Sequence, residues 1–218
     1  MFILRSLFYL FAIAGIAQLV SLEGYRALAL AQYSEHSLTE YMQDVMALLS
    51  CILFFYASRL DDKLHIVSVL LAALLGMMFV RESDALLDQY VFDGAWQVIV
   101  VLILACVAVF LRGKLSKAYA SLTEYSLQAS AGIFLAGFVT LLAFSRLMGR
   151  SSFWQSVMGD SYIRVVKNIV EEGIETFGYS LVLISAIELV LVCLKRRKYS
   201  NAVTPRFCSS EQKNTSCC

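Results

Sequence analysis

Two groups of charged residues in this chain have types and spacings that could support chemistry. The first group follows an apolar run that ends at Val80, and it consists of Arg81, Glu82, Asp84 and Asp88. If a helix continues beyond Val80, then Arg81, Asp84 and Asp88 share an arc of about 60°, and Glu82 points about 100° away from Arg81. Carboxylates beside an arginine could bind a cation or take part in proton transfer.

The second group precedes the last apolar run of the chain. If this segment is helical, its members share an arc of about 100°. They are Arg164, Asn168, Glu171, Glu172, Glu175 and Tyr179. Glu175 and Tyr179 lie at or within the start of the run, where a carboxylate needs a partner or a water-filled cavity. We expect the Arg81 face of the first group to meet this face, and Arg81 to couple with Glu175.

A solvated rim of charge is the alternative interpretation of both groups. Asp and Glu contribute weakly to the orientation of a membrane protein, so they are freely placed outside. An exposed rim pair contributes about 0–1 kcal/mol, whereas breaking a buried pair costs roughly 3–5 kcal/mol. The sequence leaves both interpretations open.

The number and positions of the histidines disfavour metal sites that depend on histidine. The chain has two, His36 and His65, and they fall on opposite sides of the predicted membrane. They cannot share a zinc ion or a haem. We predict no resident cofactor, and the ion chemistry that remains is a divalent cation bound by carboxylates, for which Ca²⁺, Mg²⁺ or Mn²⁺ is suited.

The elements that must position these residues are membrane helices. Of the 218 residues, 59% are hydrophobic and only 16% are charged. Six apolar segments have 17 to 20 residues each, close to the ~20 that cross a ~30 Å hydrocarbon core. They cover residues 6–22, 41–58, 64–80, 95–111, 126–145 and 176–194. The sequence therefore predicts an all-α, polytopic membrane helical bundle with six transmembrane helices.

The distribution of Lys and Arg predicts the orientation of this bundle. With the N-terminus in the cytoplasm, the inner side carries 12 of the 18 basic residues and 5 acidic residues. The outer side then carries 6 basic and 12 acidic residues. Positive charge concentrates in short cytoplasmic loops, so both termini are expected inside a plasma membrane, the inner membrane if the source is bacterial. The alternative for the first segment is a cleaved signal peptide.

The chain is expected to form a single transmembrane domain over residues 1–198. The polar stretch 199–218 is predicted to be a disordered cytoplasmic tail. Residues 161–195 contain no proline, so we expect one helix that projects outward before it enters the membrane.

Small residues indicate where helices approach one another. Ala72 and Gly76 in the third segment, and Gly132 and Ala136 in the fifth, form small-xxx-small pairs. Such pairs allow backbones to pack closely, and we expect them to mark contacts within the bundle. Glu188 is the carboxylate that lies well inside a segment, and it is expected to reach toward the inner interface.

Composition and motifs allow three classes of function. The first is an accessory, scaffold or regulatory membrane protein, which needs only the bundle and an outer polar surface. The second is a small transporter or a cation- or proton-coupled carrier that uses the outer carboxylates. The third is a membrane enzyme acting at the outer interface, although no nucleophile motif or phosphate-binding loop is present. The expected partners are membrane lipids and another membrane protein, and no nucleic acid.

Overall fold

The computed structural model describes residues 2–30 and 37–214, with side chains placed for 3–28, 37–84 and 87–199. It is 89% helical, and no strand occurs in the described part of the chain. In chain order the elements are α1 (Phe2–Leu30), α2 (Leu38–Ser58), α3 (His65–Glu82), α4 (Asp84–Tyr90), α5 (Ala95–Leu111), α6 (Leu115–Ser126), α7 (Ala129–Val139), the π-helix η1 (Thr140–Phe144), α8 (Ser145–Met148), α9 (Ser151–Met158), the 3-10 helix η2 (Gly159–Ser161) and α10 (Arg164–Asn214).

Several of these helices are long and apolar enough to cross a membrane. Five qualify alone, and they are Ile3–Leu28, Leu38–Ser58, His65–Glu82, Ala129–Met148 and Arg164–Tyr199. A sixth candidate is α5 taken together with α6, to which it is bent by 102°. The prediction of an all-α chain with several long apolar helices is confirmed.

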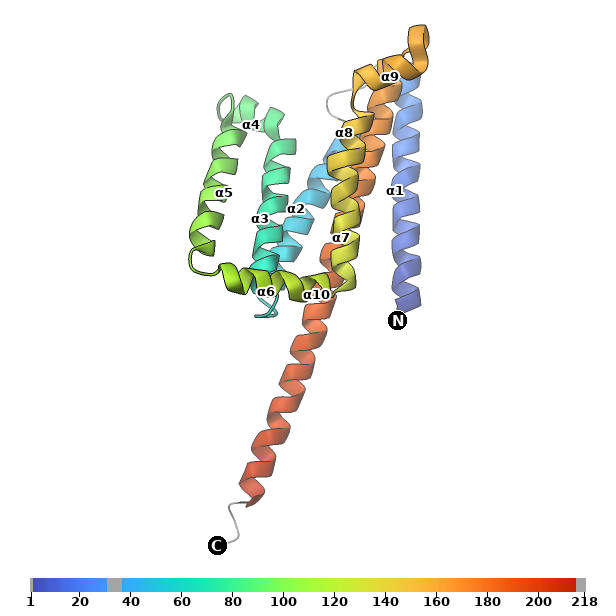
Figure 1. The fold of residues 1–218 in the computed structure, drawn as a ribbon. Helices are drawn as coiled ribbons and strands as arrows, with labels where there is room; N and C mark the ends of the chain where they lie inside the picture. The colour runs from blue at the N-terminus through green and yellow to red at the C-terminus, as the bar shows by residue number, and fades with distance from the viewer. Residues whose placement is uncertain (1, 31–36, 215–218) are drawn as a thin grey trace.

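The long helix α10 forms the spine of the bundle (Figure 1). It packs against α2 and α7, and α1 lies along its other side. Next to α2 stands α3, and α5 packs on α3 at the edge of the molecule. The start of α1 and the exit of α10 lie at the same end, which is the lower end in Figure 1. A single helix was predicted over residues 161–195. The helix α10 starts only at Arg164, because residues 159–161 form the separate 3-10 helix η2, and it then continues without a break beyond residue 195.

The short helix α6 was not expected from the sequence. It occupies part of the predicted inner loop and lies across the lower end of the bundle, between α5 and α7 (Figure 1). Ser121 fixes α6 to the start of α3, because its hydroxyl donates to the carbonyl oxygen of Lys63 and accepts from the amide of Val67. The bend places α5 and α7 far apart at this end.

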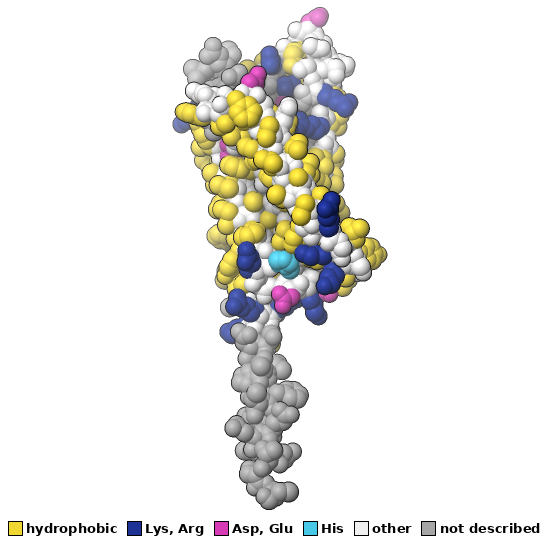
Figure 2. Space-filling model, turned by 90° about the vertical axis from the view of Figure 1, so that its left-hand side faces the viewer, with side chains coloured by type: hydrophobic (Ala, Val, Ile, Leu, Met, Phe, Trp, Pro, Cys, Tyr) yellow, Lys and Arg dark blue, Asp and Glu magenta, His cyan; other side chains and the backbone are white. Residues whose placement is uncertain are grey.

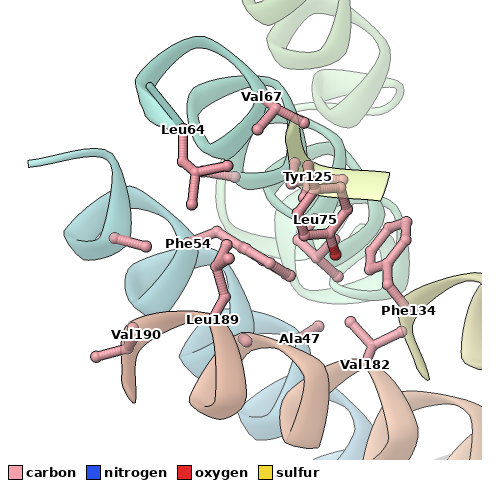
Figure 3. Packing of buried hydrophobic residues seen from close by; sticks show 14 of the residues in the cluster. Ala47, Phe54, Leu64, Val67, Leu75, Tyr125, Phe134, Val182, Leu189 and Val190 are labelled. Carbon is pink, nitrogen blue, oxygen red and sulfur yellow. The ribbon is translucent and has the colours of Figure 1, made fainter. Parts of the chain in front are cut away.

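The core lies between α2, α3, α7 and α10 (Figure 3). Phe54, Leu75 and Leu189 are fully buried in it. The Phe54 and Phe134 rings pack edge to face, with their centres 5.8 Å apart. The outer surface is also apolar, with a broad hydrophobic band and Lys and Arg side chains toward both ends (Figure 2). A helix bundle in lipid requires apolar side chains both in its core and on its outer surface.

Two glycines allow α7 and α10 to cross closely. A Cβ on Gly137 would lie 2.8 Å from the carbonyl oxygen of Gly178. The predicted contact through Gly132 and Ala136 is wrong, because both residues are exposed and a Cβ on Gly132 would meet nothing within 4 Å. The contacting face of α7 is therefore the one that carries Gly137.

The predicted contact on α3 is confirmed at Ala72. This residue is buried, and the Cys51 thiol of α2 donates to its carbonyl oxygen at 3.2 Å. Gly76 is more open, since a Cβ there would meet only the Cys51 sulfur, at 3.6 Å. The α2–α3 hairpin is thus packed closely at Ala72 and loosens at Gly76.

The end of α10 continues as helix to Asn214. Side chains of 200–214 are not described, and residues 215–218 lie outside the described part of the chain. The disorder predicted for residues 199–218 therefore stays a prediction.

Candidate functional site

A cluster of carboxylates lies where α2 begins, α3 ends and α10 approaches the bundle, at the upper end in Figure 1. The cluster, called here the upper polar cluster, is built from side chains of α2, α3, α8 and α10. Its members are Gln43, Asp44, Glu82, Ser145, Glu171, Glu172, Glu175, Thr176 and Tyr179.

Glu82 joins α3 to α10. The Tyr179 hydroxyl donates to Glu82 Oε1 at 3.1 Å, and Tyr179 is only 1% exposed. Arg81 is also near the same carboxylate oxygen, with 3.8 Å between its Nη1 and Glu82 Oε1. Its side chain is 48% exposed, so the buried hydrogen bond from Tyr179 is the stronger constraint on the two helices.

Glu172 joins α10 to α2. Gln43 Nε2 donates to Glu172 Oε2 at 2.7 Å, and it also lies 3.2 Å from Thr176 Oγ1. Glu172 lies one turn before the apolar segment 176–194. Burial raises the pKa of its carboxyl to about 8, and repulsion by Glu175 adds to the rise, while the Gln43 hydrogen bond opposes it. Glu172 is thus positioned to hold a proton near neutral pH.

Glu175 is held by Ser145, which is fully buried. The Ser145 hydroxyl donates to Glu175 Oε1 at 2.5 Å. Ser145 directly follows the π-helix η1, whose extra residue per turn rotates the side chains that come after it. The π-helix therefore changes the face on which Ser145 lies, and single π-turns of this kind often occur at functional positions.

Glu171 lies at the outer edge of the cluster beside Lys167. The Lys167 ammonium is 2.7 Å from Glu171 Oε2 and also donates to the carbonyl oxygen of Gly149 at 3.3 Å. Gly149 leaves the room that the carboxylate occupies, since a Cβ there would overlap Glu171 Oε1. This contact fastens the segment after α8 onto α10.

Asp44 was not among the predicted site residues. It lies near enough to Glu82 for the two carboxylates to repel each other, and its buried Oδ1 accepts no hydrogen bond from the described residues. The sequence carried a signal for it, because Gln43 and Asp44 are polar residues within the first turn of an apolar segment. Such residues commonly face the bundle interior.

The structure brings together part of the predicted set. Glu82, Glu171, Glu172, Glu175 and Tyr179 meet within the upper polar cluster, with Arg81 at its rim. The remaining four are placed elsewhere: Asp84 and Arg164 are exposed, Asn168 is half-buried, and Asp88 accepts the Gly94 amide at 2.9 Å in the turn before α5.

The predicted geometry of the first group is wrong in one respect. The face that meets α10 is that of Glu82, and Glu175 bonds to Ser145 instead of pairing with Arg81. The reason is that α3 ends at Glu82 and a new helix, α4, starts at Asp84. Arg81, Asp84 and Asp88 are therefore not on one continuous helix.

Two further polar contacts hold α10 outside this cluster. Glu188 accepts from the Tyr9 hydroxyl at 2.7 Å, and its other oxygen lies 3.3 Å from Arg5 Nη1. The partners of Glu188 are thus on α1. At the lower end, Arg196 binds Asp61 at 3.2 Å and Glu124 at 2.8 Å. This clamp joins α10 to the α2–α3 hairpin and to α6.

The part of the chain that the structure describes contains no group of three or more His, Cys, Asp or Glu side chains arranged to hold a metal ion. His36 lies outside the described residues, and His65 donates from Nδ1 to the carbonyl oxygen of Ser58 at 2.8 Å. A divalent cation at the carboxylates stays a prediction.

Comparison of the chain with protein-family models, with curated proteins and with solved structures gives no match.

Proposed function

We propose that the chain is a multi-pass protein of the plasma membrane with six transmembrane helices and with both termini in the cytoplasm. The candidate spans and the apolar outer surface support insertion. The start of α1 and the exit of α10 lie at the same end of the bundle. Basic residues lie at that end, in the α2–α3 hairpin and around the α5–α6 turn, and they are Arg59, Lys63, Arg112, Lys114 and Lys117. Such a bias is typical of cytoplasmic loops.

Within that membrane the proposed role is that of an accessory, scaffold or regulatory protein. The observation that carries this proposal is that Glu82, Glu172 and Glu175 are each held by a side chain from another helix. The Arg196 clamp fixes the opposite end in the same way. A bundle fastened at both ends suits a fixed framework better than a carrier, whose halves must rock around a central site.

The experiment that tests this role is quantitative co-purification. The full chain, tagged at its N-terminus, is extracted from its native membrane in a mild detergent, and the proteins that accompany it are quantified by mass spectrometry. An accessory role predicts a stoichiometric membrane-protein partner. A matched control is an unrelated tagged six-helix protein at equal expression. The same purification is repeated after the proteins in the membrane have been crosslinked. Recovery of the chain alone from these crosslinked membranes would contradict the accessory role.

A proton-coupled carrier is the second candidate, and Asp44 is the observation that favours it. Its buried Oδ1 is without a hydrogen bond among the described residues, and it lies beside another carboxylate, Glu82. Together with Glu172, these groups could exchange protons. Proteoliposomes with an internal pH dye would then show a proton flux that Asp44→Asn abolishes and that Asp84→Asn, at an exposed position, leaves unchanged.

A further inference from the structure

A groove in the apolar surface lies between α2, α3 and α5. Its volume is about 650 Å³, within the roughly 300–1,000 Å³ typical of small-molecule sites. The floor consists of the small residues Ala72, Ala73 and Gly76 of α3. Larger side chains form the walls, among them Phe55 of α2 and Phe110 of α5. The groove exists because the floor residues have almost no side chain, while the walls rise on both sides.

The walls of the groove are almost wholly apolar over most of its length. Ile52 of α2 and Leu102 of α5 are more than half exposed, although both are large hydrophobic residues. In water such an exposed apolar groove would be costly, and in a membrane it is open to acyl chains. The groove therefore matches the chemistry of a lipid tail.

Positive charge gathers at one end of this groove. The Arg59 guanidinium lies 5.0 Å from the centre of the Phe55 ring, and the Lys114 ammonium lies 4.4 Å from the centre of the Phe110 ring. The His65 ring packs against Phe110 at 6.0 Å. Since Phe55 and Phe110 both line the groove, Arg59, Lys114 and His65 lie around the same mouth.

Figure 2 shows one side of the molecule, with a hydrophobic field in the middle and Lys and Arg side chains gathered around its lower edge. Of the two carboxylates on the neighbouring hairpin, Asp61 is bound to Arg196 and Asp62 is exposed. The charge at the mouth is thus mainly positive. The mouth of the groove lies at the same end of the bundle as the start of α1 and the exit of α10.

We propose that this groove binds an anionic phospholipid, with one acyl chain along Ala73 and Gly76 and with the phosphate held by Arg59 and Lys114 beside the His65 ring. The charged mouth selects this occupant, because an apolar helix from another protein would gain nothing from the two basic side chains. Basic pockets between membrane helices bind anionic head groups in this way. The proposal rests on the membrane location proposed above and is independent of the accessory role.

The test is native mass spectrometry of the full chain in detergent, with phosphatidylglycerol or phosphatidylethanolamine of identical acyl chains added. We expect one phosphatidylglycerol to be retained in preference to phosphatidylethanolamine. The double variant Arg59→Ala/Lys114→Ala should weaken phosphatidylglycerol binding at least about tenfold, because each basic side chain contributes separately. Both residues are exposed, so their removal leaves the fold intact.

The matched control is Arg150→Ala/Arg164→Ala, which removes the same charge from exposed positions at the other end of the molecule. It should bind phosphatidylglycerol like the unmodified chain. Gly76→Leu fills the groove without a clash at its Cβ, because the nearest atom there is the Cys51 sulfur at 3.6 Å. A cooperative thermal unfolding transition would show that this variant is folded, and the folded variant should lose both lipids.

Three results would overturn the proposal. They are equal retention of the two lipids, undiminished binding by the Arg59→Ala/Lys114→Ala variant, and undiminished binding by a folded Gly76→Leu variant. A protein that crosslinks to Cys106 in the groove and displaces the lipid would also overturn it. That last result would instead support the accessory role, so the two proposals can fail separately.

Discussion

Tyr179 of α10 donates a hydrogen bond to Glu82 at the end of α3, across a distance of 3.1 Å. The two residues are 97 positions apart in the chain, and Tyr179 is almost completely buried. A carboxylate in such a place is stabilised by the donor that it has there, and a tyrosine hydroxyl in an apolar core needs an acceptor. This contact therefore fixes the C-terminal end of α3 relative to α10, the spine of the bundle.

The first prediction is that Tyr179 and Glu82 are energetically coupled. A double-mutant cycle with Tyr179→Phe and Glu82→Ala should give a coupling of about 1–3 kcal/mol in the free energy of unfolding in detergent, since a hydrogen bond to a charged group is lost. The matched cycle with Arg81→Ala and Glu175→Ala should give only ~0–1 kcal/mol. A larger coupling in the second cycle would contradict the assignment of partners.

The second prediction concerns the crossing of α7 and α10. Gly178→Ala would place a Cβ 2.7 Å from Leu141 Cγ. Overpacking of this kind should lower the free energy of unfolding by about 1–3 kcal/mol. The control is Gly132→Ala, whose Cβ meets nothing within 4 Å, and it should unfold at the temperature of the unmodified chain or slightly above it. Equal unfolding temperatures for the two variants would rule out the glycine crossing.

The sequence predicted the class of fold because long apolar runs leave few alternatives. The sequence could not predict which residues of α7 contact α10. Gly132 and Gly137 lie on the same helix, and the spacing of small residues does not indicate which face of that helix is in contact. The π-helix Thr140–Phe144 adds to the difficulty, since it changes the register of all side chains that follow. The hydrogen bond between Ser145 and Glu175 depends on that register.

The candidate site was predicted in its position and in part of its membership. The charges at the end of the third segment and before the sixth do meet, because both flank helices of one small bundle. The assumption of a continuous helix beyond Val80 led to Arg81 as the contact residue, although α3 stops at Glu82. Asp44 could be suspected from its place in an apolar segment, but its neighbour Glu82 follows only from the packing of α2 on α3.

The third prediction is a dependence of stability on pH that is due to Glu172. Its pKa is raised from the ordinary value of 4.5 to about 8 in the folded chain, chiefly by burial. Between these two values the folded state therefore binds more protons at this carboxyl than the unfolded state does. The contribution of Glu172 to the free energy of unfolding is thus most favourable below pH 4.5 and declines as the pH rises toward 8. Groups around the carboxyl are Gln43, Glu40, Glu171 and Glu175.

Thermal unfolding in detergent between pH 5 and pH 8.5 measures this dependence. Glu172→Gln keeps the shape of the side chain and removes its titration, so the variant should lose much of the decline that the unmodified chain shows. Asp84→Asn, at an exposed position, is the control and should leave the decline unchanged. An identical pH profile for Glu172→Gln would show that another group is responsible.

The fourth prediction is that α6 and the two termini face the cytoplasm, whereas the segment between α9 and α10 faces outward. In a background without native cysteines, an impermeant thiol reagent added to intact cells should label Asp160→Cys and should not label Lys117→Cys. Both positions are exposed, so a difference in labelling reports the side of the membrane. The physical reason is that α6 and the exit of α10 lie at one end of the bundle, and basic residues in short loops favour the cytoplasmic side. We expect Lys117→Cys to be labelled only after the cells are permeabilised. Labelling of Lys117→Cys in intact cells would show that every helix has the opposite orientation.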